Sequence, residues 1–383
     1  MNGFLVTRLP VLNEAVLARR LSLSAFVDWV RPEAEKIVAD SHRVLTRAQA
    51  RDLLQELAMI VASAERHYQS NGEEPGFAVQ LLGVDNALMR LGAIADHPPR
   101  DSAYSYWTWH PMTLAFTRDS REKLFASIVN STVQQMDVVA GRMRSVSMIT
   151  TQLSDPEVVL HAHGTAEILA LVARSLNPLA RKAPDGSDLF SAKYFATEFR
   201  TWLAPWVVGN RKWDGPSAAN FAAFFETDLR LAPASRFYSD YVQRRLETLP
   251  GEERRRVSQA FSEPTLEDRV LVELGQTRAS LETMSDETVA EIVIEKRVAP
   301  FLTAVARGSD ALQRWTKIHL ALVHKSLAEP AVAGGVSDLT VAMSKGTGGG
   351  EWREELPAIL KMRRGHRTLE RLFDIARGIE GQR

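Results

Sequence analysis

The helical pattern is clearest in the segment Leu312-Gln313-Arg314-Trp315-Thr316-Lys317-Ile318-His319-Leu320-Ala321-Leu322-Val323-His324. In a helix, Leu312, Trp315 and Leu322 share one face, and His319 lies on that face with them. The imidazole is therefore expected to point inward. An uncharged imidazole on a rigid helix suits axial ligation of a haem iron. It equally suits a core histidine whose ring nitrogens bond to the backbone.

The same three-to-four spacing of apolar residues runs through most of the chain. Helices are predicted over 24–37, 46–63, 76–94, 121–143, 155–175, 216–231, 239–249 and 265–281. Proline lies in or near the first turn at Pro156 and Pro264, and Ser285 precedes a further apolar run, as is typical of helix starts. Alternating strand patterns are scarce. The fold class is predicted to be all-α.

Proline-rich and glycine-rich segments mark the expected boundaries. The run His97-Pro98-Pro99-Arg100 separates an N-terminal helical region, residues 1–100, from a larger helical domain, residues 101–383, which contains His319. The stretch 331–350 is rich in Gly, Ser and Thr and has little helical pattern. No fixed-period repeat indicates a solenoid.

Composition excludes several classes of protein. Lys+Arg and Asp+Glu both total 47, so the net charge is zero and general binding to nucleic acid or to an anionic membrane is not expected. No apolar run is long enough for a membrane span, and no secretory signal precedes the first helix. A cytoplasmic location is therefore expected. The chain has 383 residues, which are enough to bury a large core.

The chain contains no cysteine. Disulfides, iron–sulfur clusters, cysteine-type zinc sites and thioether-linked haem are therefore excluded. A metal must be held by other side chains or arrive inside a cofactor.

A glycine-rich run, Gly346-Thr347-Gly348-Gly349-Gly350, follows the His319 segment. Such a run is commonly a linker. It does not match a Walker phosphate loop, because no strand precedes it. A third interpretation is a backbone that approaches a flat ligand closely, with Thr347 as its polar side chain.

These motifs resemble the C-terminal part of the indoleamine and tryptophan 2,3-dioxygenase superfamily, in which a helix histidine, a glycine run and a further helix follow in this order. A second block agrees: residues 195–206, Phe-Ala-Thr-Glu-Phe-Arg-Thr-Trp-Leu-Ala-Pro-Trp, are similar to that superfamily's Phe-x-x-x-x-Arg substrate segment. Trp109-His110-Pro111, Val208-Gly209 and Gly215-Pro216 make the chain most similar to the monodechloroaminopyrrolnitrin synthase branch. The resemblance covers about residues 107–372.

The resemblance implies roles for particular residues. His319 would be the proximal ligand of a b-type haem iron, with Arg314 and Gly346 near the cofactor. Arg200 would hold the carboxylate of the substrate, a task suited to its planar fork of donors. Phe195 would line the indole pocket. The residues of the glycine run that would contact the substrate are Thr347 and Gly348.

Two positions depart from the superfamily pattern. The arginine that commonly stands three residues before the histidine is replaced by Thr316, with Arg314 or Lys317 as possible substitutes. The tyrosine eight residues after the histidine is replaced by Leu327. On the oxygen-facing side, Ser131 and Thr132 are the candidates in the predicted helix 121–143, and His110 is an alternative.

The resemblance implies a haem-dependent oxygenase that acts on tryptophan or a related aromatic amino acid with O2, by ring cleavage or rearrangement. One alternative is a peroxide-using haem hydroxylase of an aromatic amino acid. Another is a non-catalytic helical binding protein whose basic end, residues 361–371, recruits a partner; a solvated helix face explains that end equally well. The chain is expected to act as a monomer or homodimer.

Overall fold

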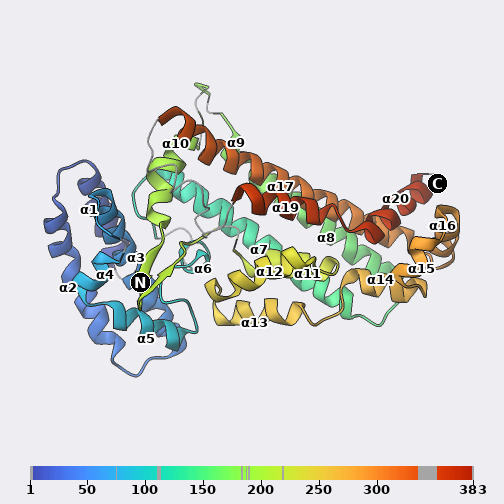
Figure 1. Ribbon diagram of the computed structural model, residues 1–383, viewed down its shortest axis with the longest axis horizontal. Coiled ribbons are helices and arrows are strands. Elements are labelled where there is room, and N and C mark those ends of the chain that lie inside the picture. Colours follow the sequence, from blue (N-terminus) through green and yellow to red (C-terminus); the bar gives the residue numbers. More distant parts are fainter. Residues whose placement is uncertain are drawn as a thin grey trace.

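The chain folds as an assembly of helices, as Figure 1 shows for the computed structural model. The structure describes residues 3–74, 76–109, 114–182, 184–186, 188, 190–217, 220–334 and 352–381. Within these ranges the only named strands form one short hairpin. The all-α prediction is confirmed.

The first helices lie together at one end of the molecule (Figure 1). They are η1 Phe4–Arg8, α1 Leu9–Leu17, α2 Leu23–Ser41, α3 Arg47–Ser70, α4 Phe77–Leu82 and α5 Asp85–Ala95. Helix α3 begins with a capping box, in which Thr46 and Gln49 satisfy each other's backbone N–H groups. The single helix predicted over 76–94 is two helices, because Gly83 adopts a left-handed φ of 64° and ends the first. The domain boundary at residue 100 stays a prediction.

The remaining helices form the larger body. Their bounds are α6 Ala103–Trp107, α7 Ser120–Met148, α8 Pro156–Ser175, α9 Asn177–Ala180, α10 Ala192–Tyr194, η2 Phe195–Phe199, η3 Arg200–Leu203, α11 Ala222–Leu231, α12 Arg236–Arg245, η4 Leu246–Thr248, α13 Gly251–Ala260, α14 Leu266–Leu274, α15 Arg278–Thr283, α16 Asp286–Glu295, α17 Ala299–Gly334, α19 Trp352–Arg363 and α20 Arg367–Gly381. The long helix α17 packs along α8, and α7 packs on both α8 and α11. These four helices frame the interior of the body.

Two local features were not predicted. Strands β1 Trp206–Val208 and β2 Arg211–Trp213 pair antiparallel, with Trp206 opposite Trp213. The turn between them is Gly209-Asn210, both with positive φ, which is the residue pair that a tight hairpin favours. The helix predicted over 265–281 is broken because Gly275 takes a left-handed φ of 64°.

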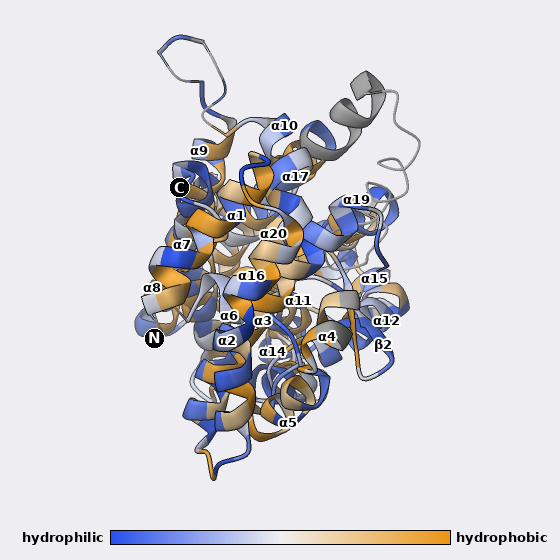
Figure 2. Cartoon of the chain, turned by 90° about the vertical axis from the view of Figure 1, so that its left-hand side faces the viewer, coloured by the Kyte–Doolittle hydropathy of each residue, from blue (hydrophilic) through white to orange (hydrophobic). Residues whose placement is uncertain are grey.

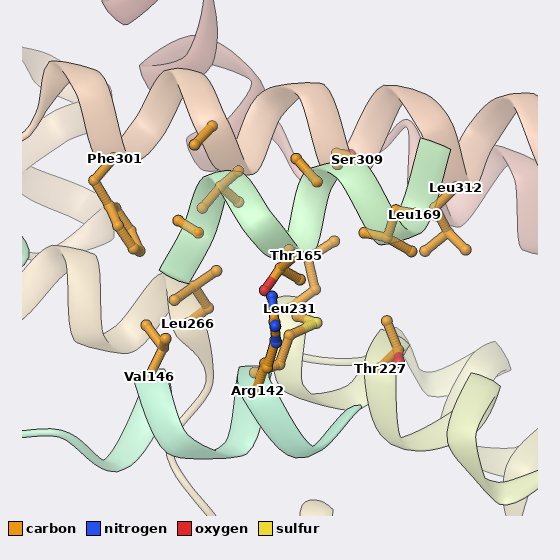
Figure 3. A pocket seen from close by; sticks show the side chains of 16 residues that line it. Arg142, Val146, Thr165, Leu169, Thr227, Leu231, Leu266, Phe301, Ser309 and Leu312 are labelled. Carbon is orange, nitrogen blue, oxygen red and sulfur yellow. The ribbon is translucent and has the colours of Figure 1, made fainter. Parts of the chain in front are cut away.

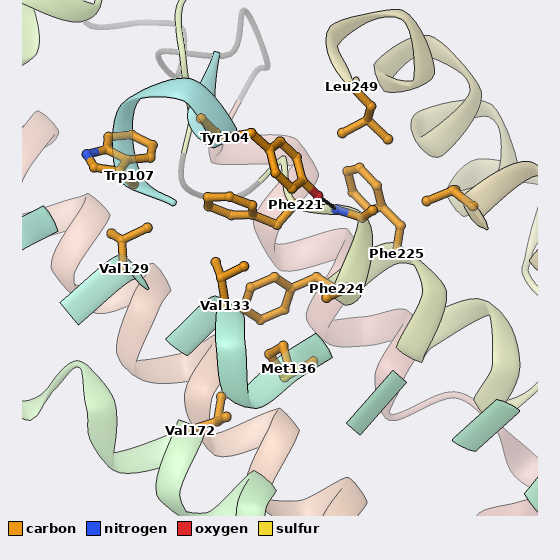
Figure 4. Close-up of a cluster of buried hydrophobic side chains, with 14 of the residues drawn as sticks. Tyr104, Trp107, Val129, Val133, Met136, Val172, Phe221, Phe224, Phe225 and Leu249 are labelled. Carbon is orange, nitrogen blue, oxygen red and sulfur yellow. Dashed lines mark hydrogen bonds between the residues drawn. The ribbon is translucent and has the colours of Figure 1, made fainter. Parts of the chain in front are cut away.

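Aromatic side chains fill the interior between α6, α7 and α11. Figure 4 shows Tyr104, Phe221 and Phe224 facing Val133 and Met136 of α7. The Tyr104 hydroxyl accepts a hydrogen bond from the backbone N–H of Ala222 at 2.7 Å, which fixes the start of α11. Figure 2 shows apolar and polar residues on different faces of the helices. No helix within the described ranges is long and apolar enough to cross a membrane.

Candidate active site

His319 lies on α17 and faces a pocket of about 390 Å³ that is partly open to solvent. Helices α11, α12, α17 and α19 form its walls. The lining residues are Phe224, Phe225, Asp228, Tyr238, Tyr241, Trp315, Thr316, His319, Leu356, Ile359 and Arg363. Trp315 stacks on Phe224 with ring centroids 4.6 Å apart and lies 5.0 Å from the His319 ring. The imidazole is therefore held among aromatic side chains, as the predicted helix face requires.

The pocket keeps the His319 imidazole uncharged. Burial of the ring, and secondarily the positive charge of Arg363, lowers the pKa of His319 to about 4. Its ring makes no hydrogen bond to any described residue, so no described backbone group satisfies it as the core-histidine interpretation requires. A neutral imidazole with an uncommitted nitrogen is the form that ligates iron.

A buried ion pair forms the polar wall of the pocket. Arg363 of α19 donates to both carboxylate oxygens of Asp228 on α11, at 2.8 and 2.7 Å. The Tyr238 hydroxyl donates to the same carboxylate at 2.6 Å, and Arg363 also donates to the Thr316 hydroxyl. Burial alone would lower the pKa of Arg363, but the adjacent Asp228 raises it, so the guanidinium stays charged. Asp228 and Arg363 were not predicted as site residues, because residues 361–371 were interpreted as a solvated basic end.

Arg200 and Phe195 lie in a second aromatic region. They begin consecutive irregular helices: Phe195 opens the π-helix η2 and Arg200 opens the 3-10 helix η3. A π-helical turn is frequent at functional sites. Phe195 lies 5.8 Å from Phe125 and 5.9 Å from Phe190, ring centroid to ring centroid. Arg200 is only 8% exposed, and this burial lowers its pKa to about 10. The η2 segment packs against α17, the helix that carries His319.

The other predicted side chains do not line the His319 pocket. Thr132 is buried against α8, where its hydroxyl donates to the Ile128 carbonyl and bonds to the Ser175 hydroxyl, both at 2.8 Å. Ser131 is exposed on α7, and Arg314 is exposed on α17. It is Arg363, arriving from α19, whose guanidinium lies beside Thr316.

Some predicted site residues lie outside the described residues. They are His110, Gly346, Thr347 and Gly348. Their predicted roles therefore stay predictions.

The residues around His319 fit a haem. Within the described part of the chain, no group of three or more His, Asp or Glu side chains converges to hold a bare metal ion. An iron held by one imidazole must bring its other ligands inside the cofactor, as a porphyrin does. The aromatic walls suit a flat apolar macrocycle, and the Arg363–Asp228 ion pair adds a polar wall to the same pocket. Fold and site together are those expected of an all-α protein that holds a haem through one histidine.

A comparison with protein families identifies which group of such proteins this is. The model of the family described as "Monodechloroaminopyrrolnitrin synthase PrnB" matches residues 36–364. The chain therefore belongs to this family, which confirms the resemblance found in the sequence and the b-type haem that it implies. No curated protein matches the chain significantly.

Proposed function

We propose that the protein is a haem-dependent oxygenase that takes O2 and tryptophan or a related indole amino acid. The observation that carries the proposal is the uncharged His319 imidazole, without a described hydrogen-bond partner, in an aromatic pocket of a chain from the monodechloroaminopyrrolnitrin synthase family. Within this proposal the substrate is a chlorinated tryptophan that undergoes ring cleavage or rearrangement, which is what the resemblance to the monodechloroaminopyrrolnitrin synthase branch implies. When bound, the haem supplies the activation of oxygen.

His319 is proposed to hold the iron through its free ring nitrogen. Because its pKa lies near 4, the ring needs no deprotonation before it ligates at neutral pH. Trp315 and Phe224 restrict the ring's orientation by packing beside it. Arg363, clamped by Asp228, supports α17 from α19 through its bond to Thr316. Arg314 stays a candidate at the edge of the cofactor, together with Gly346.

Arg200 is proposed to bind the carboxylate of the amino acid. Its guanidinium is largely removed from water, which strengthens its attraction for an anion. Phe195, with Phe125 and Phe190 around it, offers a flat apolar surface for an indole ring. A substrate anchored at both ends has its ring and its carboxylate fixed relative to each other.

Four further residues complete the proposal. Thr347 and Gly348 are proposed to contact the substrate, and Ser131 and Thr132 are the candidates for the oxygen-facing side. Of these two, Thr132 already uses its hydroxyl in hydrogen bonds to Ile128 of α7 and Ser175 of α8. A change of Thr132 should therefore alter stability as well as turnover.

A haem-binding experiment tests the proposed role of His319 as the iron ligand. Protein supplied with haem should show an intense Soret absorption, and His319→Ala should abolish or strongly shift it. His324→Ala is the matched control, because His324 lies on the same helix but is exposed. A colourless protein, or a spectrum that responds equally to both substitutions, contradicts the haem role.

A substrate comparison tests Arg200. Arg200→Gln should weaken binding of tryptophan about tenfold to a hundredfold and leave tryptamine, which lacks the carboxylate, nearly unchanged. Binding is measured from the change in the haem spectrum, first with tryptophan and then with halogenated tryptophans. Equal losses for tryptophan and tryptamine would remove the carboxylate role. Product formation with O2 rather than peroxide separates the oxygenase from a peroxide-using hydroxylase.

A further inference from the structure

One face of helix α8 is not covered by the described part of the chain, although its other faces pack on α7 and α17. Figure 2 shows α8 at the left edge of the molecule. On the uncovered face, Leu160 is 72% exposed and Leu171 is 49% exposed. They belong to a row with alternating spacings of three and four residues, which is the spacing by which one helix packs along another in a coiled coil. We call this row the α8 seam, and it consists of Glu157, Leu160, Gly164, Glu167, Leu171 and Arg174.

The α8 seam is complementary to a second copy of itself that runs antiparallel. Its residues are placed symmetrically about the midpoint of residues 165–166. A two-fold axis through this midpoint brings Leu160 opposite Leu171 of the second copy, and Glu157 opposite Arg174. Within the described chain, the side chains of Glu157 and Arg174 have no ion pair or hydrogen bond of their own. A parallel arrangement would instead bring like charges together, so the charges favour the antiparallel one.

The same axis brings Glu167 of the second copy opposite Gly164, where an arginine of α7 reaches the seam. A Cβ atom at Gly164 would lie 2.6 Å from Arg142 Nη1, so the guanidinium lies directly against this glycine. Figure 3 shows Arg142 extending from α7 toward Thr165 of α8. Its side chain is partly exposed and has no ion pair or hydrogen bond with a described residue. A carboxylate of a second copy would supply the missing acceptor, although Glu167 also accepts from Arg307 of its own chain at 2.6 Å.

We propose that the protein forms a two-fold symmetric homodimer in which the α8 seams of two copies pack antiparallel. The leucines supply the apolar contact, and the charged residues fix the direction and register of the two helices. A contact centred on one helix from each copy is small, so we expect a dissociation constant of about 1–100 µM. No residue of the seam lines the His319 pocket, so the dimer does not depend on the proposed reaction.

Sedimentation equilibrium of the haem-loaded, full-length protein tests the charged pairs. The mass of the wild type should rise from one chain toward two with increasing concentration. Glu157→Arg and Arg174→Glu each bring like charges together, and each should weaken association about tenfold to a hundredfold. An equimolar mixture of these two variants should associate again, because every contact between unlike chains then joins opposite charges. Glu35→Arg is the matched control and should change nothing, because Glu35 is exposed on α2 among the N-terminal helices.

A further variant tests the apolar contact. Leu160→Gln should weaken association about tenfold, whereas Val272→Gln on α14, where the side chain is 74% exposed, should leave it unchanged. Both side chains are largely in water in the single chain, so neither change should unfold it, and circular dichroism verifies this. Three results would overturn the proposal: a wild type that stays monomeric at about 100 µM, a dimer that ignores the charge reversals, or a mixture of the reversed variants that stays monomeric.

Discussion

Two aspartates of this protein pair with arginine in opposite surroundings, Asp228 with one arginine and Asp96 with three. Asp228 is buried with Arg363 and Tyr238 in the wall of the His319 pocket. Asp96 ends α5 with a left-handed φ of 50° at the surface, where its side chain is 31% exposed. Its arginine partners are Arg47, Arg254 and Arg255.

The difference shows how burial changes the contribution that an aspartate–arginine pair makes to the stability of the fold. In the wall of the pocket, water does not reach either side chain to take the place of its partner. Asp228 and Arg363 therefore hold α11 and α19 in one arrangement. At the surface, three arginines share one carboxylate and water can replace any of them. Asp96 nevertheless joins the first helices to α13, because its carbonyl accepts a hydrogen bond from the Gly251 N–H at 2.7 Å.

The largest effect is expected from removing the buried carboxylate. Asp228→Asn leaves the Arg363 charge buried without its partner, and should lower the free energy of unfolding by about 3–5 kcal/mol. Asp96→Asn, the matched surface change, should cost about 0–1 kcal/mol. Urea denaturation of both variants measures the contrast. Similar losses for the two would show that burial does not separate these clusters.

A steric change at the surface cluster should have an intermediate effect. A Cβ atom at Gly251 would overlap the Asp96 carboxylate, so Gly251→Ala must displace it from its arginines. We expect a loss of about 1–3 kcal/mol in thermal or urea unfolding. Asp96→Ala in the same chain should recover part of it, since the overlap disappears. Gly378→Ala on α20, where a Cβ meets open space, is the control and should cost nothing. A loss that Asp96→Ala leaves unchanged contradicts the overlap.

The smallest effect is a dependence of stability on pH. The pKa of His319 falls from 6.5 to about 4 on folding, so between these values the unfolded chain binds the additional proton. Stability contributed by His319 is therefore lost as pH falls. The pKa of Asp96 is lowered from 3.8 by its arginines, so its contribution is lost only in more acidic solution. Between about pH 7 and pH 5, His319 should therefore respond whereas Asp96 should not.

The measurement is urea unfolding of haem-free protein. Buried His67 and His97 change in the same direction, so the wild type is compared with His319→Gln. The variant should lose less stability than the wild type between about pH 7 and pH 5, by on the order of 1–2 kcal/mol. Identical curves would mean that His319 does not stay neutral in the folded protein.

Local patterns in the sequence predicted much of this fold. Helical spacing and caps such as Ser285 depend on residues a few positions apart, and the structure confirms them. The face of His319 followed from the same spacing. The pair Gly209-Asn210 indicates a tight turn, but no hairpin was predicted there because the pattern of the rest of the chain is helical.

The features that the sequence did not predict depend on contacts between residues that are far apart in the chain. Asp228 and Arg363 meet only after α11 and α19 pack together, and nothing near either residue indicates its partner. The position of Thr132 on a helix was predicted correctly. Which neighbour its hydroxyl meets depends on α8, and helical period alone does not determine that.

The position of α17 in the chain has a consequence for biosynthesis. This 36-residue helix covers α8 and carries His319, yet a ribosome makes it long after α7, α8 and α11. Until it emerges, the apolar faces of those earlier helices have no cover and are open to chaperones or to aggregation. The nascent chain also lacks His319, the proposed iron ligand, throughout that interval. Haem uptake through His319 would therefore be a late event in the synthesis of this polypeptide, after every helix from α1 to α16 has been made and shortly before α19 completes the pocket.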